Sequence, residues 1–241
     1  MNKLIIIPAY NEEENIVKVI TEIEKNDLGF DYIIINDCSK DNTLKICKDN
    51  NFNVIKLPIN LGIGGAMQAG YIYALRNNYD IAIQIDGDGQ HDPSYIKSLV
   101  KPIELGQADL IIGSRFIEKE GFQSSFMRRI GINYFNMLLK LFTGIRITDP
   151  TSGFRACNKT IISYFANNYP KDYPEPESIM TLLKEGFRII EIPVKMKERV
   201  GGQSSIRLLK SIYYMIKVTL AILIAREKST KRFRLKENDC P

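Results

Sequence analysis

Residues 83–90 end an apolar run in two carboxylates, Asp86 and Asp88, with one glycine between them. The apolar run predicts a buried strand, and Asp-Gly-Asp-Gly predicts the turn that ends it. Neighbouring carboxylates repel each other unless a cation lies between them. With the amide oxygen of Gln90 they form a hard donor set that suits Mg²⁺ or Mn²⁺. We therefore expect Asp86, Asp88 and Gln90 to hold a divalent metal and an anionic ligand such as a nucleotide diphosphate. The alternative is a solvated turn.

The elements that must position this turn follow from the apolar runs. Strands are predicted over 3–7, 32–36, 53–57, 80–85 and 109–113, with a late strand over 187–192. Helices are predicted between them: one from Glu12 capped by Asn11, one capped by Ser39 or Asp41, one from Gly62 to about 77, and one from Pro93. This alternation predicts an α/β fold whose mainly parallel sheet carries helices on both faces. The carboxyl ends of such strands form one edge, where ligands bind.

The second half of the chain does not continue the regular alternation of strands and helices. Helices are predicted over 126–142, near 158–167 and from about Ser178, and residues 149–155 and 198–205 are predicted loops. A long amphipathic helix is predicted over 206–225. Its apolar face comprises Leu209, Ile212, Tyr213, Ile216, Leu220 and Leu223, and its opposite face comprises Arg207, Lys210, Tyr214 and Lys217. Packing on the protein core and burial in a membrane interface both fit this pattern, and the basic stretch 226–236 favours an anionic bilayer.

Composition limits the classes of protein. The chain has 241 residues, 44% of them hydrophobic, and a formal charge of +5, which fits one folded domain, alone or with an appendage, that meets anionic ligands or an acidic membrane surface. No basic block interleaved with aromatic residues indicates nucleic-acid binding. The cysteines lack metal-binding spacing and indicate free thiols of a reducing cytoplasm. They are Cys38, Cys47, Cys157 and Cys240. Neither a signal peptide nor a transmembrane helix is expected.

Six short segments occur one after another along the chain, and their order and spacing can be compared with those of known families. They are Pro8-Ala-Tyr-Asn-Glu-Glu13, Asn36-Asp-Cys-Ser-x-Asp41-x-Thr43, Asn60-x-Gly-x-Gly-Gly-Ala66, Asp86-Gly-Asp-Gly-Gln-His91, Gly113-Ser-Arg115 and Thr151-Ser-Gly-Phe-Arg155. Together they resemble the family 2 inverting glycosyltransferases with the GT-A fold, and specifically the dolichol- or polyprenyl-phosphate sugar transferases. The resemblance implies a GT-A domain over 1–205, with a nucleotide-sugar half to about 115 and an acceptor half from 116. The amphipathic helix and a basic tail occupy 206–241.

The resemblance also assigns site residues. Nucleotide-sugar contacts are implied for Pro8, Ala9, Tyr10, Glu12, Asp37, Gly64, Asp86, Gly87, Arg199 and Ser205. Catalytic roles are implied for Asp88, Arg115, Arg129, Arg155 and Glu177. Two segments depart from the family pattern. Asn36-Asp37-Cys38-Ser39 replaces the usual Asp-Asp-Gly-Ser, and residues 199–205 lack the Lys that often follows the first Ser, a contact that Arg207 can supply.

The chemistry separates two kinds of acceptor. In an inverting in-line transfer, a metal and arginines stabilise the leaving diphosphate. An alcohol acceptor needs a general base, whereas a phosphate, with a second pKa of about 6, is already largely an anion and needs cations. Arginines of the second half can supply them: Arg128, Arg129, Arg155, Arg199 and Arg207. Glu177 is the candidate base for an alcohol of a glycan or lipid, and Pro-Glu-Pro-Glu otherwise starts a helix. His91 is expected to be a supporting contact or an exposed turn residue.

The expected function is therefore transfer of a hexose from a nucleotide sugar, with UDP favoured over GDP, to undecaprenyl or dolichyl phosphate for cell-envelope polysaccharide or glycoconjugate synthesis. The enzyme would lie in the cytoplasm, peripheral on the inner face of the cell membrane, docked through the 206–225 helix or through a small membrane subunit. Two alternatives remain at this point: the alcohol transferase, and a nucleotide-binding module without catalysis.

Overall fold

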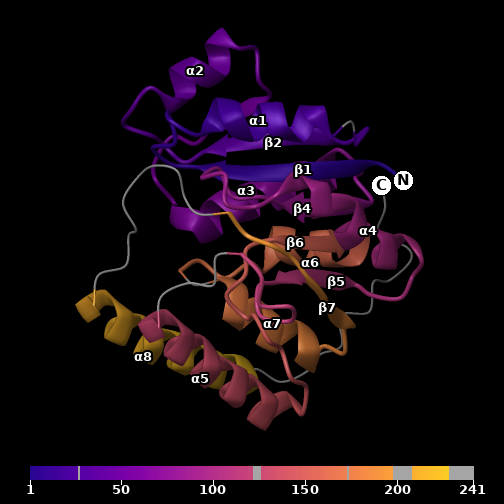
Figure 1. Ribbon diagram of the computed structural model, residues 1–241, viewed down its shortest axis with the longest axis vertical. Helices are drawn as coiled ribbons and strands as arrows, with labels where there is room; N and C mark the ends of the chain where they lie inside the picture. Colours follow the sequence, from indigo (N-terminus) through magenta and orange to yellow (C-terminus); the bar gives the residue numbers. More distant parts are fainter. Residues whose placement is uncertain (27, 122–125, 173, 198–207, 228–241) are drawn as a thin grey trace.

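The computed structural model describes residues 1–26, 28–121, 126–172, 174–197 and 208–227, without the side chains of 126–128, 208–214 and 225–227. The described residues form a seven-stranded sheet in the order β3-β2-β1-β4-β6-β5-β7 (Figure 1). The strands are β1 (Lys3–Ala9), β2 (Asp31–Asn36), β3 (Val54–Lys56), β4 (Ile81–Gln84), β5 (Leu110–Ser114), β6 (Arg155–Asn158) and β7 (Ile189–Pro193). All the strands expected from the apolar runs are present.

One strand runs against the others. β6 pairs antiparallel with both β4 and β5, and every other pairing is parallel. The carboxyl ends of β1, β2, β4, β5 and β7 therefore share one edge, and β6 begins at that edge with Arg155. The mainly parallel α/β fold is confirmed. The sequence interpretation placed Arg155 at the end of a loop and contained no strand here, which is wrong because residues 155–158 add a short strand between β4 and β5.

Helices cover both faces of the sheet (Figure 1). They are α1 (Ile16–Lys25), α2 (Thr43–Asp49), α3 (Gly62–Arg76), α4 (Ile96–Glu104), α5 (Phe126–Thr143), α6 (Lys159–Asn167), α7 (Pro174–Lys184) and α8 (Leu208–Glu227), with a 3₁₀ turn over Pro93–Tyr95. Side chains alternate between the two faces along β1, so Ile5 and Ile7 pack with α1 and α4, whereas Leu4 and Ile6 pack with α3 and α6. Two apolar cores, one on each side, therefore hold the sheet edge in place.

Three helix starts differ from the prediction. α2 begins at Thr43 with Asn42 at the N-cap position, so neither Ser39 nor Asp41 is its cap residue, although the Asp41 carboxylate accepts the Thr43 N–H. α1 begins at Ile16 and not at Glu12, because Asn11 has the left-handed φ of 56° and its side-chain oxygen accepts the N–H of Lys40 instead of capping a helix. α7 begins at Pro174 and not near Ser178. Glu175 and Glu177 therefore lie in its first turn, where negative charge stabilises a helix.

α8 has two apolar sides. Val218 and Ile222 are buried in the core beside α5 and α7, and the Thr219 hydroxyl lies 3.1 Å from that of Tyr134 on α5. Ile216 and Leu220, which belong to the predicted apolar face, are exposed. The helix thus packs on the core and also presents apolar side chains outward. Among the described residues, no helix combines the length and apolarity needed to cross a bilayer.

Candidate active site

The loops that follow β1 and β2 form one hydrogen-bonded unit at the sheet edge. The backbone N–H of Asn11 donates to Ser39 Oγ (3.0 Å), and that of Glu12 donates to Thr43 Oγ1 (2.8 Å). Glu12 is almost buried and its carboxylate accepts from Asn15. Tyr10 stands on this unit with 41% of its surface exposed. The two motifs therefore build a single rigid rim beside the ends of β1 and β2, which include Pro8 and Ala9.

Asp37 and Gly64 are both engaged with the protein itself. The buried Asp37 carboxylate accepts the N–H groups of Leu61 (2.7 Å) and Gly62 (2.9 Å) at the start of α3, where it also complements the helix dipole. A side chain at Gly64 would collide with the carbonyl oxygens of Pro170 and Lys171. The structure gives each residue a structural reason for its type, and their contacts with a nucleotide remain a prediction.

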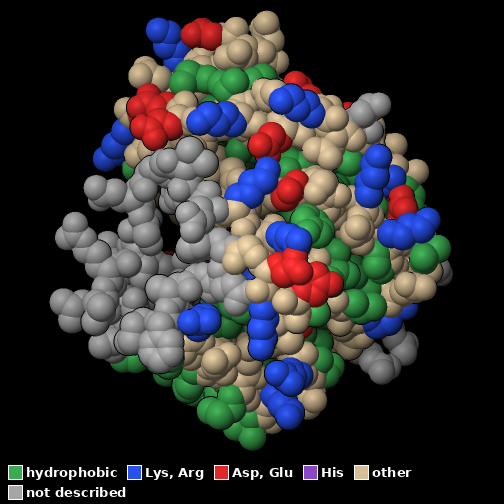
Figure 2. Space-filling view, in the orientation of Figure 1, with side chains coloured by type: hydrophobic (Ala, Val, Ile, Leu, Met, Phe, Trp, Pro, Cys, Tyr) green, Lys and Arg blue, Asp and Glu red, His purple; other side chains and the backbone are tan. Residues whose placement is uncertain are grey.

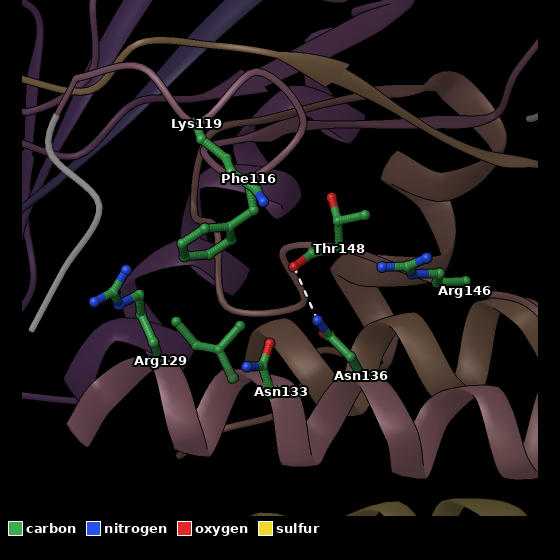
Figure 3. Close-up of a pocket in the computed structure, with 8 residues that line it drawn as sticks. Phe116, Lys119, Arg129, Asn133, Asn136, Arg146 and Thr148 are labelled. Carbon is green, nitrogen blue, oxygen red and sulfur yellow. Dashed lines mark hydrogen bonds between the residues drawn. The ribbon is translucent and has the colours of Figure 1, made fainter. Parts of the chain in front are cut away.

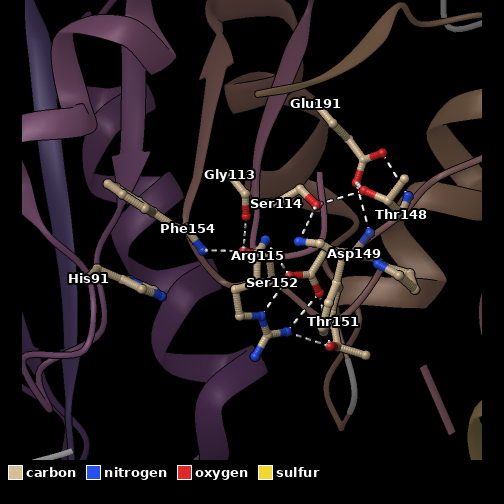
Figure 4. Close-up of polar contacts among 12 residues, drawn as sticks. His91, Gly113, Ser114, Arg115, Thr148, Asp149, Thr151, Ser152, Phe154 and Glu191 are labelled. Atoms are coloured by element: carbon tan, nitrogen blue, oxygen red, sulfur yellow. Dashed lines mark hydrogen bonds and ion pairs between the residues drawn. The ribbon is translucent and has the colours of Figure 1, made fainter. Parts of the chain in front are cut away.

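The turn after β4 is held by His91. The N–H of Asp86 donates to His91 Nδ1 (3.1 Å), and Nε2 of the same ring lies 3.6 Å from an Asp86 carboxylate oxygen. The imidazole is buried and stacks on Phe154 at a centroid distance of 4.8 Å (Figure 4). Because Nδ1 accepts a hydrogen bond, Nε2 carries the proton and faces Asp86. His91 is thus a supporting contact, and the alternative of an exposed turn residue is wrong.

Gln90 is oriented by the segment after β7. Its side-chain N–H₂ donates to the Lys197 carbonyl (3.3 Å), while the Lys197 N–H donates to the Gln90 carbonyl (2.9 Å). The side-chain oxygen of Gln90 is thereby left as the group that can meet a cation. Asp88 accepts the Gln90 N–H at 3.1 Å. Gly87, between the two acids, lies against the Pro8 carbonyl, where a Cβ would be 3.0 Å from the oxygen.

This donor set fits a nucleotide-bound metal. The described residues contain no group of three or more His, Cys, Asp or Glu side chains placed to hold a metal by themselves. Mg²⁺ in nucleotide sites typically takes one or two carboxylates and completes its shell with phosphate oxygens and water. Asp86, Asp88 and the Gln90 amide are all oxygen donors, so the residues present suit Mg²⁺ or Mn²⁺ together with a diphosphate.

Arg115, directly after β5, is tied to a loop that also reaches Asp86. Its Nε and Nη2 atoms bind the buried Asp149 carboxylate at 2.6 and 2.7 Å, and Nη2 also donates to Thr151 (Figure 4). Four residues further on, a Cβ at Gly153 would lie 3.1 Å from an Asp86 carboxylate oxygen. Residues 149–153 therefore connect the arginine to the candidate metal turn.

Arg155 is enclosed by protein acceptors. Its guanidinium donates to the carbonyls of Ser152, Pro150 and Glu175 and to the Ser178 hydroxyl, and the residue is 1% exposed. It fastens the loop before β6 to the first turn of α7. These contacts are structural, and the phosphate contact expected of Arg155 remains a prediction. Glu177, on the same turn, is partly buried.

A basic pocket of about 290 Å³ lies between α5 and the loops after β5 and α5 (Figure 3). Its lining comprises Phe116, Lys119, Arg129, Ile132, Asn133, Asn136, Arg146 and Thr148. Three of these side chains are cationic and none is acidic. Arg129 was expected here from the sequence, but Lys119 and Arg146 were missed because single basic residues in loops have no distinguishing pattern. The Arg128 side chain, Arg199, Ser205 and Arg207 lie outside the described residues.

Comparison with known proteins agrees with this architecture. The model of the family described as "Glycosyl transferase family 2" matches residues 4–165. The chain belongs to this family. Family 2 membership confirms that the protein is a glycosyltransferase.

Two curated relatives are informative. A UDP-N-acetylglucosamine–dolichyl-phosphate N-acetylglucosaminyltransferase of Methanococcus voltae is 31% identical over 211 residues, which span 79% of this chain and 84% of the relative. A polyprenol monophosphomannose synthase of Mycolicibacterium smegmatis is 27% identical over 211 residues, which span 83% of this chain and 79% of the relative. The chain thus matches most of the length of both proteins.

A solved structure shows the same fold. Glucosyl-3-phosphoglycerate synthase from Mycobacterium tuberculosis, crystallised with Mn²⁺, UDP and glucosyl-3-phosphoglycerate, superposes with a TM-score of 0.70 at 19% identity, covering 93% of this chain and 79% of that one. The fold of this family 2 transferase is therefore GT-A.

Proposed function

We propose that this protein transfers a hexose, with inversion, from a nucleotide sugar to a polyprenyl phosphate, with Mg²⁺ or Mn²⁺ as cofactor. The observation that carries the proposal is the basic pocket beside the Arg115 loop. Lys119, Arg129 and Arg146 line it and no carboxylate does. A phosphate acceptor, already largely ionised at neutral pH, needs such cations and no general base. Both curated relatives bear names of lipid-phosphate sugar synthases.

The donor would lie along the sheet edge from β2 to β4. Tyr10 offers an exposed ring on the rigid rim of the first two loops, suited to packing against a base. Asp86, Asp88 and Gln90 would hold the divalent ion, which on binding offsets the charge of the leaving diphosphate. UDP is the favoured nucleotide, supported by the UDP-sugar in the name of the M. voltae relative.

Arg115 links the two halves of the proposed reaction. Asp149 fixes the guanidinium plane through two short hydrogen bonds, and the next residue, Phe116, lines the basic pocket. Arg115 is thus connected, through residues 149–153, to the turn proposed to hold the diphosphate and, through Phe116, to the pocket proposed to receive the acceptor phosphate. A fixed cation at this position stabilises negative charge without reorganising during the transfer.

A lipid acceptor requires contact with a bilayer, and we propose that α5 and α8 make it at the cytoplasmic face. The two helices lie side by side at one end of the molecule (Figure 1). Apolar residues exposed on them include Ile130, Met137, Leu141, Ile216, Leu220 and Ile224. Figure 2 shows hydrophobic side chains interspersed with Lys and Arg at that end. This combination suits an anionic membrane surface. A small membrane subunit that assists docking is part of the proposal only if the protein alone fails to bind vesicles.

The test is a transfer assay with the full-length protein. Purified protein and Mn²⁺ or Mg²⁺ are incubated with a panel of labelled UDP- and GDP-sugars, with and without undecaprenyl or dolichyl phosphate. We expect an organic-extractable sugar product that is labile to mild acid. Asp88→Ala should abolish it, and Asp92→Asn should not, because Asp92 caps the 3₁₀ turn through the Ser94 N–H and lies outside the metal turn.

Other outcomes discriminate the alternatives. Donor binding without a lipid product, even with native membranes added, would favour an alcohol acceptor, and Glu177→Gln would then be the decisive variant. Donor binding with no transfer to any acceptor would favour a nucleotide-binding module. Product formation by Asp88→Ala at the wild-type rate would overturn the metal assignment.

A further inference from the structure

Glu191, on β7, forms hydrogen bonds with the Thr148–Asp149 turn, which is more than 40 residues away in the sequence. Its carboxylate accepts the Thr148 N–H at 2.6 Å, the Thr148 hydroxyl at 3.0 Å and the Asp149 N–H at 2.8 Å (Figure 4). Burial raises the pKa of the Glu191 carboxyl, these bonds oppose that effect, and the charge of Asp149 adds to it. Three converging donors thus hold one carboxylate, and the carboxylate in turn fixes the backbone of the turn.

The turn that Glu191 fixes carries parts of the proposed acceptor site. Asp149 is fully buried and holds Arg115 by two short bonds. Thr148 itself lines the basic pocket, and its carbonyl accepts from Asn136 of α5 (Figure 3). A shift of this turn would therefore move the Arg115 guanidinium and the pocket wall together.

A chain of hydrogen bonds connects Phe116 to Glu191, and the donor and acceptor of each bond can be assigned. The Thr148 hydroxyl has one proton, which it donates to Glu191, so Ser114 must donate to Thr148 across their 2.6 Å contact. The Ser114 oxygen accepts the N–H of Phe116 at 3.2 Å. The chain thus runs from Phe116, one pocket wall, through Thr148, another, to Glu191.

We propose that Glu191 is a positioning residue for the acceptor site, acting through the Thr148–Asp149 turn on Arg115 and on the wall of the basic pocket. It does not itself touch the substrate. The inference rests on the proposed function, because it assigns the acceptor phosphate to this pocket. A neutral carboxamide at position 191 keeps the shape of the side chain but turns an N–H₂ group toward donors, and so releases the turn.

The test compares Glu191→Gln with a matched control, Asp109→Asn. Asp109 directly precedes β5 and its carboxylate accepts the N–H (2.8 Å) and Nε–H (3.1 Å) of Arg188, directly before β7. It therefore joins β5 and β7 at their amino-terminal ends, at the sheet edge opposite the candidate site. Both full-length variants are titrated calorimetrically with farnesyl phosphate, a short isoprenyl phosphate, and assayed for the KM of undecaprenyl phosphate and of the nucleotide sugar.

We expect Glu191→Gln to raise the Kd of farnesyl phosphate and the acceptor KM about tenfold, the effect of losing a hydrogen bond to a charged group. The donor KM should stay within roughly twofold, as for an independent site. Asp109→Asn should lose comparable thermal stability and keep all three constants. Thr148→Val, which removes the hydroxyl link and keeps the backbone bond to Glu191, should shift the acceptor constants in the same direction by less.

Contrary results are equally clear. Unchanged farnesyl phosphate affinity in Glu191→Gln, or donor and acceptor KM values that rise alike, would overturn the inference even if the wild-type protein transfers sugar to lipid. If the wild-type protein binds farnesyl phosphate and makes no lipid-linked sugar, the proposed function fails while the measured Kd values still decide the role of Glu191. If no form binds farnesyl phosphate, the inference is overturned, and if the wild-type protein also makes no lipid-linked sugar, the proposed function is overturned with it.

Discussion

Asp86 and His91 hold each other across the turn after β4, by a hydrogen bond of 3.1 Å from the Asp86 N–H to Nδ1 and an approach of 3.6 Å between Nε2 and the carboxylate. The ring fixes both the backbone and the side chain of a residue proposed to bind metal. Residues that orient a metal-binding group in this way typically contribute about 10- to 100-fold to metal affinity or activity.

His91→Phe should weaken nucleotide binding in the presence of Mn²⁺ by about tenfold or more, because it keeps the stacking on Phe154 and removes both nitrogen contacts. The measurement is calorimetric titration with UDP, with and without Mn²⁺. His91→Asn is the matched control, since its side-chain oxygen can still accept the Asp86 N–H, and it should recover part of the affinity. A metal-dependent affinity in His91→Phe equal to that of the wild type would contradict this role.

Gly153→Ala should lower transfer activity. The new Cβ would lie 3.0 Å from Gln84 Nε2 and 3.1 Å from an Asp86 carboxylate oxygen, so the carboxylate must move. Gly131→Ala on α5 is the control, because its Cβ would find only Met215 Sδ at 3.9 Å and alanine favours a helix by about 1 kcal/mol. Initial rates and thermal melts of both variants check the prediction. Equal rates in the two variants would show that the Asp86 carboxylate tolerates the displacement.

Thiol labelling should single out Cys38. Burial raises the pKa of Cys47 to about 11, with a smaller effect from Asp41, and burial raises that of Cys157 to about 12, so neither thiol forms a reactive thiolate at pH 8. Cys38 is partly exposed between Asp37 and Ser39. In a Cys240→Ser protein, we expect one fast-reacting thiol in the native state and three after denaturation. UDP with Mn²⁺ should slow the Cys38 reaction if the nucleoside lies at this rim, and an unchanged rate would place it elsewhere.

The membrane proposal predicts that acidic residues introduced on the exposed side of α5 prevent docking. Met137 and Leu141 are 63% and 74% exposed, so replacing both with Asp should leave folding intact and abolish binding to anionic vesicles. Ile59→Asp is the control, because Ile59 is 62% exposed in the loop before α3 and belongs to neither α5 nor α8. Co-sedimentation with vesicles at several salt concentrations measures the effect. Vesicle binding by the double variant equal to that of the control would exclude α5 as the docking surface.

The sheet was largely predictable because its long strands are continuous apolar runs buried on both faces, as in β1 and β2. β6 was not, because its residues, Arg-Ala-Cys-Asn, show neither an apolar run nor alternation. Its Arg155 is buried only because loop carbonyls and the first turn of α7 satisfy the guanidinium. Those acceptors are brought together by tertiary structure, so no local pattern reveals them.

The candidate site divides in the same way. The Asp86–Gln90 turn was identifiable because its donors are adjacent in the chain and follow a strand. The stacking of His91 on Phe154 and the hydrogen bonds of Glu191 to Thr148 were not identifiable, because they join residues far apart in the sequence. The predicted helix start at Glu12 was wrong because Asn11, a residue type typical of helix caps, takes a left-handed conformation here.

The place of the reversed strand β6 in the sheet affects the order in which the strands can pair during synthesis. β6 lies between β4 and β5 but follows both in the chain. A nascent chain that has emerged only to residue 114 can pair β1 to β4, but it has no strand to join β5 to them. The first four strands can therefore pair before the rest of the sheet, but the core on their α3 side is completed only by α6, which comes later in the chain. β5 can join the sheet only after residues 155–158 are available, and its pairing with β7, which brings Glu191 beside the Thr148–Asp149 turn, requires residues 189–193 as well.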